Sequence, residues 1–201
     1  MPGTVMDSPR PTLGHVNLML DTFLANATVN DLRAIVRSTL ATSPPSTSAS
    51  FIESARKRLQ QTYAKVPVAS KGLFVTLENG YSIPGPALQD TLSATRSLYG
   101  AGMGIISLQK FAEVIRATIG HRWDEDSELE AMLAVIDADI AQAIQSSKEE
   151  LLRDNPGDRA DAIAAVAQLT SVIEESRVDI QRWDGDFPFE RAADSLRYLV
   201  L

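Results

Sequence analysis

The densest group of chemically capable side chains is the run His121, Arg122, Trp123 and Asp124. Histidine can transfer protons near neutral pH, arginine can bind a carboxylate through two hydrogen bonds, and tryptophan can form the wall of an apolar pocket. The competing interpretation is a loop in which Trp123 fills the core and His121 lies near the C-terminus of a helix. The pattern favours the loop, and His121, Arg122 and Trp123 are kept as interaction candidates.

A second cluster, of aromatic side chains, surrounds Pro188. Trp183, Phe187 and Phe189 lie within seven residues of one another. Aromatic residues supply much of the binding energy at protein interfaces, which makes Trp183 and Phe187 candidates for contact with a partner. The alternative, which we favour, is that these rings anchor the last helix to the body of the protein.

Basic side chains concentrate in the first third of the chain. Arg56, Lys57 and Arg58 are consecutive, so on a helix they spread over more than one face, whereas Arg33 and Arg37 share a face. Such residues can form a patch for nucleic acid or for an acidic partner. The sequence pI of about 4.9 and the lack of interleaved aromatic residues argue against nucleic acid.

No catalytic, metal or cofactor site is predicted. The chain has no cysteine and two histidines, which excludes thiolate chemistry, zinc ribbons and iron–sulfur clusters. Asp124, Asp126 and Glu128 resemble the opening of a calcium loop, but Leu129 stands where that loop requires glycine. We therefore interpret these carboxylates as helix-capping groups.

Two further patterns suggest chemistry but fit structural roles better. The glycines at 100, 102 and 104 follow a predicted helix and lack the Lys-Ser/Thr of a phosphate loop, so they predict a turn between helices. The N–H of Ile105 could still receive an anion there. Asp137 and Asp139 are two residues apart, so they diverge on a helix and do not form a catalytic pair.

The elements that must position these side chains are helices. Apolar residues recur at helical spacing from residue 12 to residue 200, except in residues 67–86, where proline and glycine are frequent. There Asn79-Gly80 lies between two short β-prone runs, which predicts a hairpin. Helices 126–152 and 158–183 have heptad-like spacing, which we expect to pack them side by side. Their apolar seams are Leu129, Leu133, Ile136, Ile140 and Ala143, and Ala162, Val166, Leu169, Ile173, Ser176, Ile180 and Trp183.

The sequence therefore predicts an all-α fold, either an irregular bundle or a short α-solenoid, with about eight helices. One small β-hairpin is expected near residues 73–83. We expect a single domain over residues 1–201, with sub-lobes 12–66 and 87–201 joined by residues 67–86. No secretory signal or run of about 20 apolar residues is present, so the cytoplasm or nucleus is expected and a membrane is not.

Charge is unevenly distributed along the chain. Residues 1–122 hold 12 Lys and Arg against 7 Asp and Glu, whereas residues 123–201 hold 7 against 19, which together give the net charge of −7. With no catalytic signature, the expected function is a protein–protein interaction or adaptor module with a protein partner of unknown identity. Self-association through helices 126–152 and 158–183 is a further expectation. The alternative is an enzyme or small-molecule binder with a pocket near His121 and Trp123.

Overall fold

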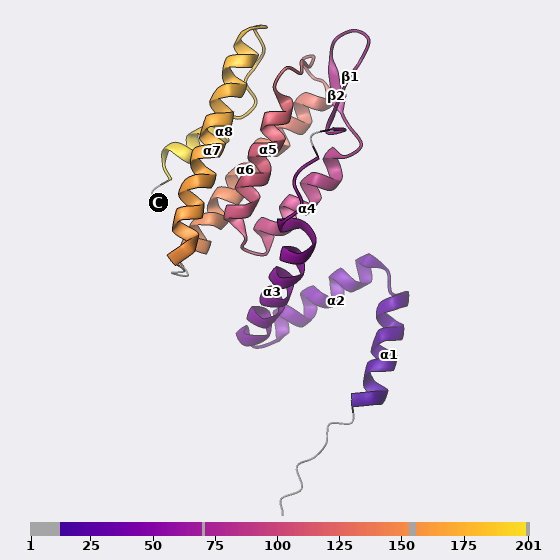
Figure 1. Cartoon of the computed structure of the whole chain (residues 1–201). Helices are drawn as coiled ribbons and strands as arrows, with labels where there is room; N and C mark the ends of the chain where they lie inside the picture. The colour runs from indigo at the N-terminus through magenta and orange to yellow at the C-terminus, as the bar shows by residue number, and fades with distance from the viewer. Residues whose placement is uncertain (1–12, 70, 153–155, 200–201) are drawn as a thin grey trace, which may run out of the picture. The chain divides into compact units, whose positions relative to one another are not determined.

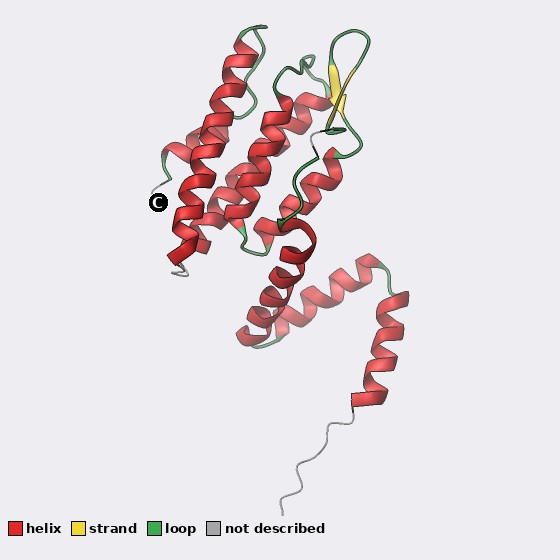
Figure 2. Cartoon of the chain, in the orientation of Figure 1, coloured by secondary structure: helices red, strands yellow, loops and turns green. Residues whose placement is uncertain are grey.

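The computed structural model describes residues 13–69, 71–152 and 156–199, and these are predominantly helical (Figure 1). Within these ranges the chain forms eight α-helices, one π-helical turn and one two-stranded sheet, which Figure 2 shows by colour. This confirms the predicted all-α fold with a small hairpin, in the form of a helical bundle. In the described part of the chain, no helix combines the length and the apolar character needed to cross a membrane.

The helices follow one another along the chain with the hairpin near the middle. The bounds of the elements are α1 Leu13–Asn26, α2 Val29–Thr42, α3 Pro45–Leu59, the π-helix η1 Gln60–Ala64, β1 Phe74–Thr76, β2 Ser82–Pro84, α4 Leu88–Gly100, α5 Gly104–Thr118, α6 Glu128–Leu151, α7 Pro156–Gln181 and α8 Glu190–Arg197. Thr28 caps α2 by accepting a hydrogen bond from the Asp31 N–H, and Ser127 caps α6 in the same way from Glu130.

By its internal contacts the chain divides into two compact units, one ending at Phe51 and the other beginning at Ile52. The first unit contains α1, α2 and the start of α3, and none of its residues from 18 to 51 is buried. The second unit contains the remaining elements and the buried core. Residues 67–86, where the sequence suggested a boundary between sub-lobes, lie inside the second unit.

Helix α5 is the centre of the second unit. Ten of its fifteen residues are buried, so it must be covered on almost every side. It packs against α4, α6 and α7, and Phe111 and Ile115 are fully buried in the core between them. Enclosing the helix with the most buried residues removes much apolar surface from water.

The seam of α6 is buried, as is that of α7 apart from the half-buried Val166 and Trp183, and each helix makes its largest contact with α5. Both helices make a larger contact with α5 than with each other, which differs from the direct pairing expected from the heptad spacing. The reason is that α5 offers apolar side chains around most of its circumference, whereas each seam offers one stripe. Because the seams are closed within one chain, self-association stays a prediction that would need other faces.

The hairpin has the predicted turn. Strands β1 and β2 are antiparallel, with Phe74 opposite Pro84 and Thr76 opposite Ser82. Gly80 has a φ of 85°, which is the left-handed conformation that an Asn-Gly turn requires. The hairpin lies beside the bundle, as a two-stranded sheet needs other elements for stability.

At the glycine-rich turn before α5, the backbones of α5 and α6 lie close together. A Cβ atom on Gly104 would lie 2.2 Å from the backbone nitrogen of Ser147 in α6, so a side chain does not fit there. A Cβ on Gly100, by contrast, would meet nothing within 4 Å. The turn between helices predicted from the glycine spacing is present, and Gly104 is the position that sets the contact between α5 and α6.

We expect Gly104→Ala to lower the free energy of unfolding by about 2 kcal/mol or more, because the methyl group forces the α5 and α6 backbones apart. Gly100→Ala is the matched control, and its effect should lie between no change and about 1 kcal/mol of stabilisation. Urea unfolding of both variants measures this difference. Equal destabilisation by the two substitutions would contradict the close approach at Gly104.

Candidate functional site

His121 joins the hairpin to the loop after α5. Its Nδ1 lies 2.8 Å from the Ser82 hydroxyl and 3.3 Å from the Thr76 hydroxyl, and these two hydroxyls are 3.1 Å apart. The backbone N–H of Ser82 also donates to the carbonyl of Arg122 at 2.7 Å. The His121 ring packs against Phe74 with 5.4 Å between centroids. We call Thr76, Ser82 and His121 the hydroxyl–imidazole cluster.

A serine beside a histidine can be a catalytic nucleophile with its base. Here the geometry supports a structural role instead, in which the pair attaches the hairpin to the loop after α5. The Ser82 side chain is 2% exposed, so a substrate carbonyl cannot approach its hydroxyl. No carboxylate among the residues that the structure describes orients His121, which a nucleophile–base pair needs. Burial lowers the pKa of His121 below 6.5, which keeps the ring neutral at neutral pH.

Trp123 and Trp183 pack against each other in the core. Trp123 is buried, and the two rings meet edge to face with 5.0 Å between centroids. A Cβ on Gly185 would lie 2.2 Å from the Trp183 ring, so the indole lies directly on this backbone. The indole N–H of Trp183 is buried, and no described residue accepts a hydrogen bond from it. Both rings therefore help to hold the end of α7 to the body.

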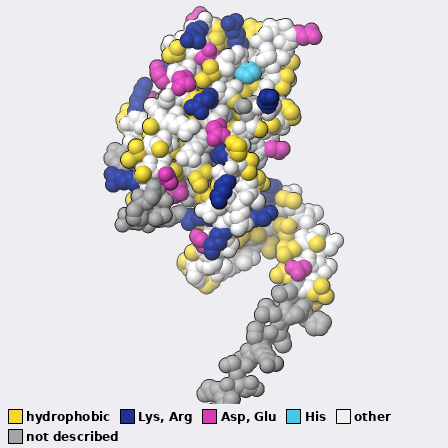
Figure 3. All heavy atoms as spheres, in the orientation of Figure 1, with side chains coloured by type: hydrophobic (Ala, Val, Ile, Leu, Met, Phe, Trp, Pro, Cys, Tyr) yellow, Lys and Arg dark blue, Asp and Glu magenta, His cyan; other side chains and the backbone are white. Residues whose placement is uncertain are grey.

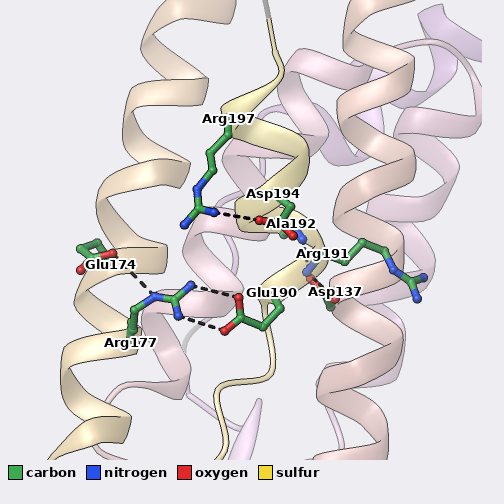
Figure 4. A network of polar contacts seen from close by, with 8 residues as sticks. All are labelled: Asp137, Glu174, Arg177, Glu190, Arg191, Ala192, Asp194 and Arg197. Carbon is green, nitrogen blue, oxygen red and sulfur yellow. Dashed lines mark hydrogen bonds and ion pairs between the residues drawn. The ribbon is translucent and has the colours of Figure 1, made fainter.

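Phe187 contributes to the attachment of α8. Its ring meets Phe189 edge to face at 5.9 Å, and the Arg177 guanidinium lies 3.8 Å from its centroid. The same guanidinium donates to both carboxylate oxygens of Glu190 at 3.0 and 3.4 Å (Figure 4). These contacts fit the anchoring role proposed for the aromatic cluster better than an exposed binding site.

Asp137 of α6 holds the N-terminus of α8. Its carboxylate accepts hydrogen bonds from the backbone N–H groups of Arg191 and Ala192 at 3.2 and 2.7 Å (Figure 4). Burial raises its pKa, and these two hydrogen bonds partly oppose that change. Asp139 points to α4 instead, where it binds Arg96 at 2.7 Å and the Tyr99 hydroxyl at 2.9 Å. The two aspartates diverge, as the sequence predicted.

Tyr99 is the most perturbed acid in this group of contacts. Burial and the hydrogen bond to Asp139 raise the pKa of Tyr99 to about 12. Its hydroxyl therefore stays protonated and donates to the carboxylate at any physiological pH. The Arg96, Tyr99 and Asp139 contacts join α4 to α6 and give no sign of a reactive group.

The basic run does not form one patch. The Arg56 Nε turns inward and donates to the carbonyl of Ala101 at 2.7 Å. Lys57 is exposed and lies 3.9 Å from Glu53, and Arg58 is exposed as well. Arg56 lines a cavity of about 380 Å³ at the glycine-rich turn, together with Gln142, Gln145 and Glu149 of α6.

The N-terminus of α5, which could have received an anion, binds a side chain of the protein itself. The Ile105 N–H donates to the Glu150 carboxylate at 2.9 Å. A carboxylate at a helix N-terminus is favourable because the N–H groups there lack helical partners. The contact also joins the start of α5 to the end of α6, beside the close approach at Gly104.

The first unit exposes large apolar side chains on two helices. Those on α1 and α2 are between 37% and 78% exposed, and Figure 3 shows hydrophobic side chains at the surface of this part of the chain. Spacing places a set of them along one side of each helix. We call this set the N-terminal apolar surface: Met19, Leu20, Phe23 and Leu24 of α1 with Ile35 and Val36 of α2.

A cavity of about 240 Å³ lies between α4, α5 and the segment that follows η1. Lys110 of α5 lines this cavity and is 8% exposed, and its ammonium donates a hydrogen bond to the carbonyl of Val66. The neighbouring Glu113 accepts a hydrogen bond from the Val68 N–H at 2.7 Å. We call residues 65–69 the strap, since both α5 side chains hold it at the cavity.

The sequence did not identify Lys110, Ser82 or Arg177, and it singled out Asp137 only as one of two diverging aspartates. For Lys110 no clear signal was present, because Ser107, Gln109 and Glu113 also interrupt the apolar residues of α5 between Ile105 and Ile115. The other three are ordinary polar residues whose partners lie far away in the chain. His121 and Trp123 line neither the Lys110 cavity nor the cavity at the glycine-rich turn.

No family model, curated protein or solved structure matches the chain. Its function is therefore inferred from the side chains and surfaces described above. Most of the polar contacts described above attach one element to another. The N-terminal apolar surface and the buried Lys110 are different, because apolar exposure and a buried charge both disfavour the folded state.

The hydroxyl–imidazole cluster makes stability depend on pH near neutrality. Because burial lowers the pKa of His121 in the folded state, the unfolded state binds more protons between that pKa and 6.5. The contribution of His121 is thus complete above 6.5 and decreases as the pH falls below it. Wild type should lose more thermal stability than His121→Gln between about pH 7.5 and about pH 5.5.

Thermal unfolding followed by circular dichroism at several pH values measures this effect. The chain has one other histidine, so His15→Gln is the matched control and should keep the wild-type pH dependence. The same pH dependence in wild type and His121→Gln would show that His121 is not the titrating group.

Proposed function

We propose that the chain is a protein–protein interaction module that binds a partner through the N-terminal apolar surface. The observation that carries this proposal is the exposure of six large apolar side chains on α1 and α2, in a unit with no buried residue between 18 and 51. Groups of exposed large apolar side chains mark binding sites in folded proteins.

The entropy cost of ordering α1 and α2, which burial within the first unit does not offset, is an argument for a partner. Helices α1 and α2 have fourteen residues each, and isolated helices of this length are marginal in water. Ordering each residue costs about 1–2 kcal/mol in backbone entropy, which burial of apolar side chains normally offsets. The first unit lacks such burial, so a partner that covers its apolar side chains would stabilise both helices.

The charges on α2 indicate what the rim of the partner should carry. Arg33 and Arg37 are exposed and lie on one side of the helix, next to its apolar residues. Stable interfaces have an apolar centre and a polar rim. A partner with an apolar helix or groove and carboxylates along one edge would match both features.

The alternative function, a pocket beside His121 and Trp123, has less support. Trp123 is 5% exposed within the core, and the His121 ring is engaged by Ser82 and Phe74. Their contacts account for both side chains through the attachment of the hairpin and of α7. We assign His121 and Trp123 no part in binding a protein partner, so the proposal rests on the first unit alone.

The interface can be tested with Phe23→Asp. Phe23 is 44% exposed, so the substitution should leave the fold of the second unit unchanged while placing a charge in the interface. Loss of one large apolar contact is worth about 1.5–3 kcal/mol, or roughly a tenfold or greater loss of affinity. Leu152→Asp is the matched control, because Leu152 is an exposed leucine of the second unit.

Affinity purification with quantitative mass spectrometry should recover a protein with wild type and Leu152→Asp but not with Phe23→Asp. Sedimentation of the purified protein identifies the case in which the partner is a second copy. If no captured protein, this chain included, depends on Phe23, the proposal is wrong.

Hydrogen exchange gives a second, independent prediction. In the free chain, amides of α1 and α2 should exchange at least about a hundredfold faster than those of α5, because the former helices lack burial. Mass spectrometry of peptides from both regions measures the ratio. Equal protection of α1 and α5 in the monomer would contradict the proposal, since it would mean that the apolar side chains are already covered.

A further inference from the structure

We propose that the cavity beside Lys110 is a binding site for a small carboxylate with an apolar chain. This inference does not rest on the proposed function, because the cavity lies in the second unit. One water needs about 10–15 Å³ of such a cavity, so a volume of about 240 Å³ has room for a ligand of at least about eight non-hydrogen atoms. A straight-chain acid of six carbons has this size.

The charge of Lys110 requires an anion. The side chain is 8% exposed, and the ammonium uses one of its three N–H groups on the Val66 carbonyl. None of the ion pairs among the described residues involves Lys110, although Asp90 also lines the cavity. A buried ammonium without a counter-ion is costly, so a bound carboxylate would relieve that cost while using the remaining N–H groups.

The remaining wall favours an apolar body. Val66, Val68, Ala94 and Leu98 present hydrocarbon to the cavity. The hydroxyls of the two lining threonines donate within the protein, that of Thr91 to Ala87 and that of Thr95 to Thr91. A sugar or a nucleoside would leave several of its own polar groups unpaired against such a wall, whereas an alkyl chain would not.

A carboxylate fits the donors better than a phosphate does. The lining contains a single cationic side chain, Lys110, and no arginine. Phosphate sites usually combine several cations or backbone N–H groups, often at the N-terminus of a helix. The start of α5, the helix that carries Lys110, is already capped by Glu150. One ammonium in a mostly apolar lining, which also holds Asp90, therefore suits a singly charged head group.

The ligand would also lie against the strap. Val66 and Val68 belong to the strap, and α5 holds it through Lys110 and Glu113. A carboxylate that shares the ammonium with the Val66 carbonyl would add a third contact at this place. Binding should therefore change the environment of the strap amides, which gives the test a readout at residue level.

The test uses hexanoate, which has eight non-hydrogen atoms, and the full chain labelled with ¹⁵N. Titration followed by amide chemical shifts should show saturable one-to-one binding, with the largest changes at Val66, Val68, Ala94 and Thr95. 1-Hexanol, which lacks the charge, should bind about tenfold more weakly or worse, and inorganic phosphate should cause no saturable change at these amides. Absence of a saturable change with hexanoate would overturn the proposal.

Lys110→Met keeps most of the side-chain stem and removes the charge. It should weaken hexanoate by about tenfold or more and change 1-hexanol by less than about twofold. Lys148→Met, on α6 and away from the cavity, is the matched control and should bind as wild type does. Wild-type affinity for hexanoate in Lys110→Met would overturn the role of the ammonium.

A second variant keeps the test decisive if Lys110→Met does not fold. Ala94→Leu retains Lys110 and extends a side chain into the cavity, since Ala94 is only partly buried where it lines the wall. It should reduce hexanoate binding by about tenfold or more through loss of space. Unchanged binding in Ala94→Leu would place hexanoate outside the cavity and overturn the proposal.

Discussion

The burial of α5 is the constraint on which the second unit depends. A helix with ten buried residues out of fifteen must be enclosed, and α4, α6 and α7 take up the positions that enclose it. The absence of a side chain at Gly104 lets α6 approach closely, and Glu150 of α6 caps the start of α5. Lys110 and Glu113 then attach the strap to the same helix. The core, the strap and the cavity thus all depend on the burial of α5.

The two units differ in the unfavourable feature that each retains, a buried charge in the second unit and exposed apolar side chains in the first. In the second unit several polar contacts join one element to another: Asp137 to the start of α8, Asp139 to α4, and His121 to the hairpin. Lys110 stands apart, because its charge has no counter-ion among the residues described. The first unit leaves apolar surface uncovered instead. An uncovered apolar face suits a protein partner, and a buried charge beside a cavity suits a small anion.

Much of the fold could be predicted from the sequence because local patterns determine it. Asn79-Gly80 requires a tight turn with positive φ, and the structure has it at Gly80. The two-residue spacing of Asp137 and Asp139 sends them in different directions on any helix. The candidate site could not be predicted in the same way. Arg56, Lys57 and Arg58 have one sequence environment, yet only the first turns inward, because Ala101 happens to lie beside it.

The sequence by itself determined the helical fold and the hairpin, since these depend on side chains a few residues apart. Only the tertiary structure decided that α5 lies against both seams, that Lys110 is buried at a cavity, and that Phe23 remains exposed. Helical periodicity shows that a helix has an apolar face, but the same pattern results whether that face is covered or open. Whether a face is buried depends on which distant segments of the chain pack against it, and a local sequence pattern does not contain that information.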